Sequence, residues 1–331
     1  MVAAEQGVFL AECLRSDCMA TDLRDLVGEL ESNMSQVVLG KADVLRLCVV
    51  ALLAGEHVLL EDVPGVGKTL VGKALAKSVD AGFSRIQFTP DLLPSDIVGS
   101  SMFLSQTSEF VFNRGPVFSN IVLADEINRT TPRTQSALLE AMSDGQVSVD
   151  GHTYPLPRPF MVIATQNPFE FEGTYPLPES QLDRFLLRTS VGYPDREDEL
   201  QVLVSHRRGE PVEELQPALD CLQVQSLQKA TREVHVDESI REYILNIVEA
   251  TRDSDELHVG ASTRGALCMY RAGQGLALVE GRDYVVPDDV KRLAVAVLAH
   301  RVIPKGYLHG GQRAAVEALI QRLVDEVPVP G

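Results

Sequence analysis

Residues 57–69 read HVLLEDVPGVGKT, and this stretch decides how the chain folds. Val58 to Leu60 form an apolar run that is too short for a helix, which predicts a buried parallel strand. A turn rich in proline and glycine follows, and Lys68-Thr69 then opens a helix with apolar residues at helical spacing. This arrangement cradles a nucleoside triphosphate: backbone N–H groups surround the phosphates, Lys68 reaches the β- and γ-oxygens, and the Thr69 hydroxyl ligates Mg²⁺.

The loop departs at one position from the pattern GxxxxGK[ST], because Asp62 stands where the pattern has its first glycine. Gly65 and Gly67 remain, and aspartate is one of the few non-glycine residues that tolerate a left-handed backbone. The alternative is a chance loop, against which the strand before it and the helix after it argue. The residues predicted to bind the nucleotide are Pro64, Gly65, Val66, Gly67, Lys68, Thr69 and Leu70.

Length and composition indicate a globular protein with a full core. A chain of 331 residues is long enough for two domains, and 45% of it is hydrophobic. Tryptophan is absent and aromatic residues make up 5%, so the core must consist mostly of Leu, Val, Ile and Ala. The formal charge of −17 argues against a protein that coats nucleic acid, since phosphate binding needs a basic face, although a local basic pore or loop stays possible.

Cysteine and histidine usage argues against disulfides and zinc. The five cysteines are scattered without a CxxC pair, which is typical of buried thiols in a reducing compartment. The seven histidines form no HExxH motif, which argues against a zinc site. The most apolar stretch, residues 44–60, contains charged residues and is too short to span a bilayer. The start of the chain has no signal-peptide pattern. We therefore expect a cytoplasmic protein without membrane insertion.

The segment before the phosphate loop contains one further candidate. Residues 1–30 form a lead-in, residues 26–34 have a helical pattern, and a second helix is expected over residues 44–53. Between them, residues 37–41 make a turn that includes Gly40. Such a segment either packs on the adenine ring, which makes Gly40 a nucleotide-binding residue, or serves only in helix packing.

A second strong signal lies at residues 121–126, which read IVLADE. Four apolar residues predict a buried strand that delivers two carboxylates at its end, where the ligand crevice of a parallel α/β sheet lies. Asp125 is expected to hold Mg²⁺ through water, and Glu126 to polarise the attacking water. The alternative is a strand that ends in two solvated carboxylates.

Further strands are expected on either side of this one. Residues 84–88 alternate between apolar and polar, and residues 160–165 form a buried run that ends in Gln-Asn-Pro. Asn167 is the candidate to hold the water or the γ-phosphate. Its alternative role is that of a simple turn residue before proline.

Two insertions are expected beside the core helices. A helix that begins near residues 91–99 is soon interrupted, and residues 110–118 alternate around Gly115-Pro116, which indicates a hairpin or loop. After a helix over residues 134–142, two short strands flank Asp150-Gly151, a signal for a type I′ hairpin turn.

Three arginines are candidates for contacts with phosphate. Arg184 precedes the last core strand and Arg188 lies within it. Either can form an ion pair in its own chain or reach the γ-phosphate of a neighbouring subunit. Arg264, in the first turn of a later helix, either points back at the nucleotide or lies on the surface.

The last third of the chain is expected to be helical. Residues 195–220 are charged and interrupted by prolines, which indicates a helix and a linker. Beyond them no strand-like run is found, and helices are expected to begin at Asp237, Ser262 and Pro287, followed by one over residues 312–327. Together they predict a small helical lid.

The motifs VPGVGKT, LADEIN, ATQNP, LDRF and GASTR, in this order, resemble those of the AAA+ ATPases, and most closely the MoxR family. The resemblance covers residue 32 to the C-terminus. It implies an α/β fold: an αβα parallel-sheet P-loop core followed by a small all-α lid, with the nucleotide pocket between them. The implied divisions are 1–30 (lead-in), 31–194 (core), 195–220 (linker helix) and 221–331 (lid).

The resemblance also implies roles for single residues and makes the departure at Asp62 harmless. The two insertions match the helix-2 and pre-sensor-1 insertions of that clade. Arg188 competes with Arg184 for the finger role. The implied roles are Walker A for Lys68 and Thr69, Walker B for Asp125 and Glu126, sensor 1 for Asn167, the arginine finger acting in trans for Arg184, and sensor 2 for Arg264.

By the same resemblance, the function is hydrolysis of ATP with Mg²⁺ in a hexameric ring. Its task would be the chaperone-like remodelling or maturation of protein complexes, including metal or cofactor insertion, with a partner that carries a von Willebrand factor A domain. Three alternatives stay open: the ATPase subunit of a magnesium chelatase, a motor on nucleic acid, and a switch that binds ATP without hydrolysing it. The charge of −17 counts against the nucleic-acid motor, and the pair Glu126 and Arg184 counts against the switch.

Overall fold

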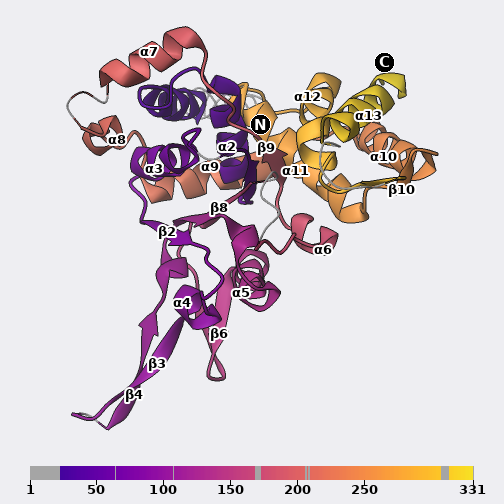
Figure 1. The fold of residues 1–331 in the computed structure, drawn as a ribbon. Helices are drawn as coiled ribbons and strands as arrows, with labels where there is room; N and C mark the ends of the chain where they lie inside the picture. Colours follow the sequence, from indigo (N-terminus) through magenta and orange to yellow (C-terminus); the bar gives the residue numbers. More distant parts are fainter. Residues whose placement is uncertain are drawn as a thin grey trace, which may run out of the picture.

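The computed structural model describes residues 23–63, 65–106, 108–167, 173–205, 207, 209–306 and 313–330. At its centre lies a parallel five-stranded sheet with the strand order β2-β5-β8-β1-β9 (Figure 1). The expected buried strands are all present. They are β1 (Val58–Glu61), β2 (Phe83–Gln87), β5 (Ile121–Asp125), β8 (Met161–Gln166) and β9 (Leu187–Thr189).

The sheet is covered on both faces, which confirms the αβα architecture. Successive strand residues point to opposite faces, so Val58 and Leu60 belong to one hydrophobic cluster and Leu59 to another. The first cluster includes residues of α2 (Ala42–Ala54) and α3 (Lys68–Ser78). The second includes residues of α4 (Pro94–Val98) and α5 (Pro132–Asp144). Because helices cover both faces of the sheet, the central strands bury side chains on both faces, and their sequences are therefore continuous apolar runs.

The parallel strands give the sheet two chemically different edges. Their carboxyl ends bring polar residues side by side, with Gln87 opposite Asp125 and Glu61 opposite Gln166. Their amino ends are apolar, with Phe83 opposite Ile121. The carboxyl edge is therefore where ligands of such a sheet bind.

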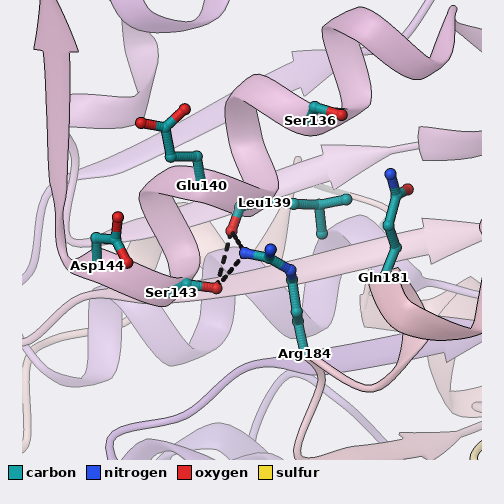
Figure 2. Close-up of a pocket in the computed structure, with 7 residues that line it drawn as sticks. All are labelled: Ser136, Leu139, Glu140, Ser143, Asp144, Gln181 and Arg184. Carbon is teal, nitrogen blue, oxygen red and sulfur yellow. Dashed lines mark hydrogen bonds between the residues drawn. The ribbon is translucent and has the colours of Figure 1, made fainter.

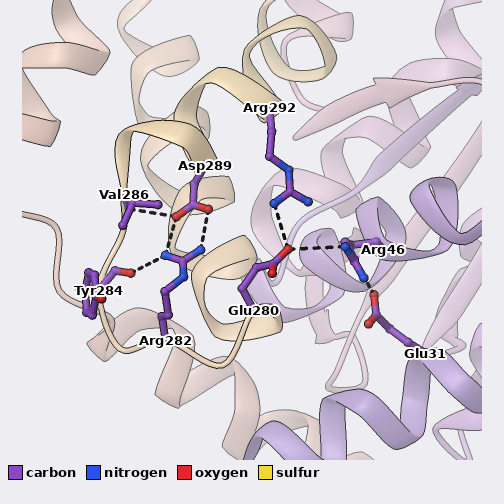
Figure 3. Close-up of polar contacts among 8 residues, drawn as sticks. All are labelled: Glu31, Arg46, Glu280, Arg282, Tyr284, Val286, Asp289 and Arg292. Carbon is purple, nitrogen blue, oxygen red and sulfur yellow. Dashed lines mark hydrogen bonds and ion pairs between the residues drawn. The ribbon is translucent and has the colours of Figure 1, made fainter. Parts of the chain in front are cut away.

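The start of the described chain packs into the core. Residues 23–35 form a helix, as expected for residues 26–34, and Val27, Leu30 and Met34 are fully buried. The rest of the lead-in, residues 1–22, lies outside the described residues. Arg46 on α2 joins this helix to the C-terminal half of the chain, because its guanidinium bonds both Glu31 (3.1 Å) and Glu280 (3.5 Å) (Figure 3).

Two hairpins extend from the core in Figure 1. One pairs β3 (Gly99–Leu104) with β4 (Glu109–Arg114), and the other pairs β6 (Gln146–Val149) with β7 (His152–Pro155). Asp150 and Gly151 have φ of 51° and 77°, as a type I′ turn requires, so this prediction is confirmed.

The prediction for the first hairpin placed its turn at the wrong residues. Gly115-Pro116 is not the turn but lies at the base, where Gly115 caps the 3₁₀-helix η1 (Pro116–Phe118). A Cβ atom on Gly115 would lie 2.3 Å from the Ile97 carbonyl oxygen, so glycine is needed there for close backbone contact.

Helices dominate the rest of the chain. They are α6 (Glu179–Leu182), α7 (Arg196–Ser205), α8 (Pro211–Glu214), α9 (Cys221–Glu233), α10 (Glu238–Asp253), α11 (Thr263–Val279), α12 (Pro287–Leu298) and α13 (Arg313–Glu326). Asp237 and Ser262 cap α10 and α11, and Pro287 opens α12, as predicted.

Two features of this helical part differ from the sequence-based expectation. Helix α9 was not predicted, and it packs against α2 and α11. The expected absence of strands was also wrong, because β10 (Leu257–Val259) pairs with β11 (Ile303–Pro304). Strands of three and two residues are too short to show a period in the sequence.

Among the described residues, no helix has both the length and the apolar character that crossing a membrane requires. Cys48 and Cys268 are buried free thiols, and Cys221 is half-buried. Burial raises the pKa of Cys48 to about 12, so this thiol stays protonated at neutral pH.

Candidate functional site

The phosphate loop joins the carboxyl end of β1 to α3. Gly65 and Gly67 have φ of 84° and 90°, and nothing lies within 4 Å of a Cβ atom placed on either one. Gly67 is the N-cap of α3, so the first backbone N–H groups of this helix are available to an anion. These open glycines and the helix N-terminus fit the phosphates of a nucleotide. Pro64, also predicted to bind it, lies outside the described residues.

Lys68 lies in the first turn of α3 and is almost fully buried. Its Nζ atom donates to the carbonyl oxygens of Asp62 (2.8 Å) and Val63 (3.1 Å). Burial lowers the pKa of Lys68, and the negative charges of Asp62, Asp125 and Glu126 oppose that shift. The positive charge of Lys68 therefore interacts with the negative charges of the carboxylates expected at this site.

Asp62 does not use the left-handed backbone that aspartate tolerates, because its φ is not positive. Its carboxylate instead accepts hydrogen bonds from the backbone N–H groups of Val63 (2.8 Å) and Gly192 (2.6 Å). Where the loop pattern has a flexible glycine, this chain therefore has a side chain that ties the loop to the segment after β9.

Asp125 ends β5 next to this loop and is buried. Its Oδ1 accepts from the Thr165 hydroxyl (2.6 Å), and its Oδ2 accepts from Nη2 (2.5 Å) and Nε (3.1 Å) of Arg85. A carboxylate together with the Thr69 hydroxyl is an oxygen donor set of the kind that Mg²⁺ prefers. Among the described residues, no cluster of three or more His, Cys, Asp or Glu side chains suited to a metal is present.

Glu126 adopts a left-handed backbone, with φ of 57°, between β5 and the 3₁₀-helix η2 (Ile127–Arg129). Its backbone N–H donates to the Thr165 hydroxyl (2.9 Å). Its carboxylate accepts from Gln87 Nε2 (2.9 Å) and Arg129 Nη1 (3.1 Å). A glutamate in this conformation is strained, and such strain persists where surrounding contacts hold it, typically at functional sites.

Sequence reasoning missed four residues that bond the two carboxylates, which are Arg85, Gln87, Arg129 and Thr165. The signal for the first two was their spacing, since polar residues two apart in a strand share a face. Thr165 was assigned to its strand but not recognised as the link between Asp125 and Glu126. That link joins residues 40 positions apart, which no local pattern reveals.

Asn167 follows directly after β8, at the same carboxyl edge. Its neighbour Gln166 donates to Glu61 Oε1 (2.6 Å), across from the start of the phosphate loop. The position agrees with a contact to a nucleotide, and the role of Asn167 stays a prediction.

Gly40 contacts the segment that follows β9. It has φ of 68°, and a Cβ atom on it would lie 1.7 Å from the Asp198 carboxylate. Beside it, Lys41 Nζ donates to the Tyr193 carbonyl oxygen (2.7 Å). Leu70 packs on the first hydrophobic cluster from the first turn of α3. Both residues lie beside the phosphate loop, and their contacts with a nucleotide stay predictions.

Arg184 lies between α6 and β9, on the amino side of the sheet. Its Nη1 atom donates to the Leu139 carbonyl oxygen (2.6 Å) and to the Ser143 hydroxyl, both on α5 (Figure 2). The phosphate loop lies at the carboxyl ends of the same parallel strands, so Arg184 points away from the nucleotide site of its own chain.

Arg188, the competing arginine, is held inside its own chain. Its guanidinium pairs with Glu61 (3.1 Å) and approaches Glu317 on α13 (3.9 Å). Arg313 pairs with the same Glu61 (3.4 Å). The side chains of Arg188 and Glu61 are 12% and 8% exposed, so this is a buried ion cluster that joins α13 to the strand before the phosphate loop.

Arg264 is exposed in the first turn of α11 and lies on the same side as Arg184. Ser262, at the start of that helix, donates to Asp183 (3.3 Å), the residue before Arg184. The positive charge of Arg264 also lowers the pKa of His57, which precedes β1 at its amino end. The structure therefore brings Lys68, Asp125 and Glu126 together and places Arg184 and Arg264 at the opposite end of the sheet.

Comparisons with known proteins agree with this architecture. Residues 57–187 match the family described as "ATPase family associated with various cellular activities (AAA)", and residues 249–323 match the AAA lid domain. The chain is 41% identical to the chaperone MoxR1 of Mycobacterium tuberculosis over 307 residues, which are 90% of this chain and 81% of that protein. It is 50% identical to the uncharacterized protein YeaC of Bacillus subtilis, over 93% of this chain and 96% of that one.

A solved structure shows the same fold. The crystal structure of a protein from Cytophaga hutchinsonii, described as "a putative ATPase", superposes with a TM-score of 0.87 at 37% identity, and the match covers 97% of this chain and 99% of that one. The similarity thus extends over the sheet, the helices that follow it and the site at the carboxyl edge.

Proposed function

Because this chain belongs to the MoxR family of AAA+ ATPases, we propose that it hydrolyses ATP in a ring whose sites are each completed by the neighbouring copy, and that hydrolysis remodels or matures a protein complex. The family establishes an ATPase of the chaperone type. The ring, its hexameric size and the remodelling task belong to the proposal.

The observation that supports the ring is the separation of the two halves of the site. Lys68, Asp125 and Glu126 lie at the carboxyl ends of the parallel strands, whereas Arg184 and Arg264 lie at the amino end. A residue on one side can reach a site on the other side only in a second copy. Such a contact is head-to-tail, and head-to-tail contacts close into rings when the rotation between copies permits.

In this proposal, each residue of the site has a chemical task. The loop amides and Lys68 bind the β- and γ-phosphates, and Thr69 and Asp125 hold Mg²⁺, which neutralises phosphate charge. Arg85 and Gln87 release the two carboxylates that they hold. Glu126 then accepts the proton of the attacking water, Asn167 orients that water, and the neighbour's Arg184 stabilises the charge that develops on the transferred phosphoryl group.

The proposal for the partner rests on the hairpin of β3 and β4. It extends away from the core in Figure 1 and exposes Phe103 and Phe110, whose rings pack together at 5.2 Å. Exposed apolar patches of this kind mark interaction sites. We propose that the hairpin reports the nucleotide state to a partner complex, with a von Willebrand factor A protein among the partners and metal or cofactor insertion among the tasks.

Other parts of the proposal rest on the family alone. We propose a cytoplasmic protein, a core over residues 31–194, a linker over 195–220 and a lid over 221–331. The AAA and lid matches, to residues 57–187 and 249–323, fall inside this core and this lid.

The test is Mg²⁺-dependent ATP turnover per subunit, measured as a function of protein concentration, with Glu126→Gln as the blank. We expect specific activity to rise with concentration, in parallel with the mass of the assembly. Activity that stays constant while the protein is a monomer would contradict a site shared between copies. Glu126→Gln should still bind ATP and assemble but lose turnover by about 10² or more.

A further inference from the structure

Helix α7 carries a stripe of apolar side chains that its own chain leaves exposed. None of its ten residues is buried. Leu200, Leu203 and Val204 follow the i, i+3, i+4 spacing that places side chains on one face of a helix. Their exposed fractions are 55%, 70% and 74%.

Such a helix lacks the burial of an apolar face that normally stabilises a short helix. Isolated helices shorter than about 12–15 residues are marginal in water, and most helices in proteins are stabilised by burying an apolar face. α7 has ten residues and an apolar stripe, but it has no such burial. A surface that covers this stripe would provide it.

α7 is attached to the side of the molecule that holds the phosphate loop. The segment leading into it bonds the loop through Gly192 and Asp62 (2.6 Å), and Asp198 on α7 contacts Gly40. In Figure 1, α7 lies at the outer edge of the molecule, beyond α3, while α6 and α10–α13 lie on the other side.

That other side carries a complementary strip on α11. Arg264, Leu267 and Arg271 follow the i, i+3, i+7 spacing and are the exposed residues along this face of the helix. Leu267 is 54% exposed, and Arg271 pairs with Glu56. The strip thus offers one apolar side chain between two arginines, beside Arg184 of the preceding segment.

The charges of the two surfaces are opposite. Glu197 and Glu199 are exposed in the first turn of α7, and exposed Asp195 just before it and exposed Arg196 leave this end of the helix with a net negative charge. On the α11 strip Arg271 is paired with Glu56 and Arg264 is exposed, which leaves the strip with a net positive charge. Opposite potentials favour association of the two surfaces and fix its orientation.

We propose that the apolar stripe of α7 docks on the Arg264–Leu267–Arg271 strip of α11 in the next copy of this chain. This inference rests on the proposed ring and names the surfaces that build it. The contact sets the arginine side of one copy against the nucleotide side of the other, so that each site receives Arg184 and Arg264 from its neighbour.

The first experiment compares Leu203→Asp on α7 and Leu267→Asp on α11 with Leu222→Asp as the matched control. Leu222 lies in the first turn of α9 and is 72% exposed, close to the 70% of Leu203. We expect each of the first two variants to weaken self-association by roughly tenfold or more in sedimentation, with a matching loss of turnover. Both should still bind a fluorescent ATP analogue as the unaltered chain does, and Leu222→Asp should assemble and turn over normally.

The second experiment mixes the two defective variants. The Leu267→Asp copy keeps an intact α7, and the Leu203→Asp copy keeps an intact α11, so a mixed pair has one intact interface. We expect the mixture to turn over ATP faster than the sum of the separate variants. Adding Glu126→Gln to the Leu267→Asp copy should abolish the recovered turnover, whereas adding it to the Leu203→Asp copy should leave it unchanged.

The possible outcomes distinguish a failure of this inference from a failure of the proposed ring. Normal assembly of Leu203→Asp would overturn the α7 contact and leave the ring intact. A mixture without recovery, or recovery abolished by Glu126→Gln in the other copy, would overturn the pairing of α7 with α11. An unaltered chain that hydrolyses ATP as a monomer would overturn the ring itself.

Discussion

At the scale of single residues, the site is a set of carboxylates that neighbouring side chains hold by hydrogen bonds. Arg85 bonds Asp125, and Gln87 and Arg129 bond Glu126. Thr165 is different, because its hydroxyl donates to Asp125 and accepts from the backbone of Glu126 without blocking the outer face of either. It is therefore a positioning residue for both carboxylates.

We predict that Thr165→Val lowers turnover by about tenfold or more, because it leaves a buried carboxylate oxygen and a backbone N–H without their partner. The same loss should reduce the free energy of unfolding by about 1–3 kcal/mol. Thr165→Ser keeps the hydroxyl and should restore turnover. The measurement is ATP turnover together with chemical denaturation, and a Val variant as active as the Ser variant would contradict the role.

The two competing arginines give a second prediction at this scale. Arg184→Ala should fold and bind ATP normally but lose roughly 10³-fold in turnover, since it removes charge from a neighbour's site. Arg188→Ala should instead lower the free energy of unfolding by on the order of 3 kcal/mol, because Glu61 loses a buried partner. Denaturation and turnover measured on both variants separate the roles. If Arg188→Ala is as stable as the unaltered chain and inactive, the finger has been misassigned.

At the scale of elements, ion pairs connect helices and strands that are far apart in the chain. Arg188 and Arg313 connect β9 and α13 to Glu61 on β1. Glu280, after α11, bonds Arg46 on α2 and Arg292 on α12 (Figure 3). The start of α12 is held by Asp289, which accepts from Arg282 through both oxygens (2.8 and 2.7 Å) and from the Val286 backbone N–H (3.0 Å).

We predict that Asp289→Ala lowers the free energy of unfolding by about 3 kcal/mol, because it leaves the partly buried Arg282 without its bidentate partner and α12 without a cap. Asp289 is 1% exposed, whereas Asp288, in the same first turn, is exposed. Asp288→Ala is thus the matched control and should cost less than about 1 kcal/mol. Thermal or chemical denaturation of the two variants provides the measurement, and equal effects would show that burial of Asp289 is not the cause.

At the scale of the whole molecule, two buried histidines make stability depend on pH. Burial lowers the pKa of His57 below its usual 6.5, and burial and the charge of Arg301 lower that of His300 further. His57 Nδ1 accepts from the Val162 backbone N–H (3.0 Å) and Nε2 lies 3.0 Å from the Met142 carbonyl oxygen, which fits a neutral ring with its proton on Nε2.

The sign of the pH dependence follows from these shifts. As the pH falls through about 6.5, the unfolded chain binds protons that the folded chain does not, so stability present above this pH is lost below it. We predict a loss of up to about 1.4 kcal/mol per pH unit for each histidine. His57→Gln should reduce this slope, whereas His152→Gln, at an exposed position, should leave it unchanged. Denaturation at pH 7, 6 and 5 tests this, and equal slopes for both variants would contradict it.

Features that depend on residues close together in the chain could be predicted from the amino-acid sequence. The phosphate loop, the Asp125-Glu126 pair at a strand end, the Asp150-Gly151 turn and the helix caps at Asp237 and Ser262 are local patterns, because backbone conformation and short-range hydrogen bonds produce them. Apolar runs and helical spacing predicted the single strands and helices, and the αβα fold was implied by the resemblance to the AAA+ ATPases.

The side of the sheet on which each arginine lies, and the partners that it contacts, depend on how the whole chain folds. Arg188 meets Glu61 and Glu317, Arg85 meets Asp125, and Asp62 meets Gly192 across separations that no local pattern encodes. The order of strands in the sheet determines these contacts, because it determines which chain segments lie next to one another at the ends of the strands. For the same reason, the distance of Arg184 and Arg264 from the phosphate loop, which underlies the proposed ring, became visible only in the folded chain.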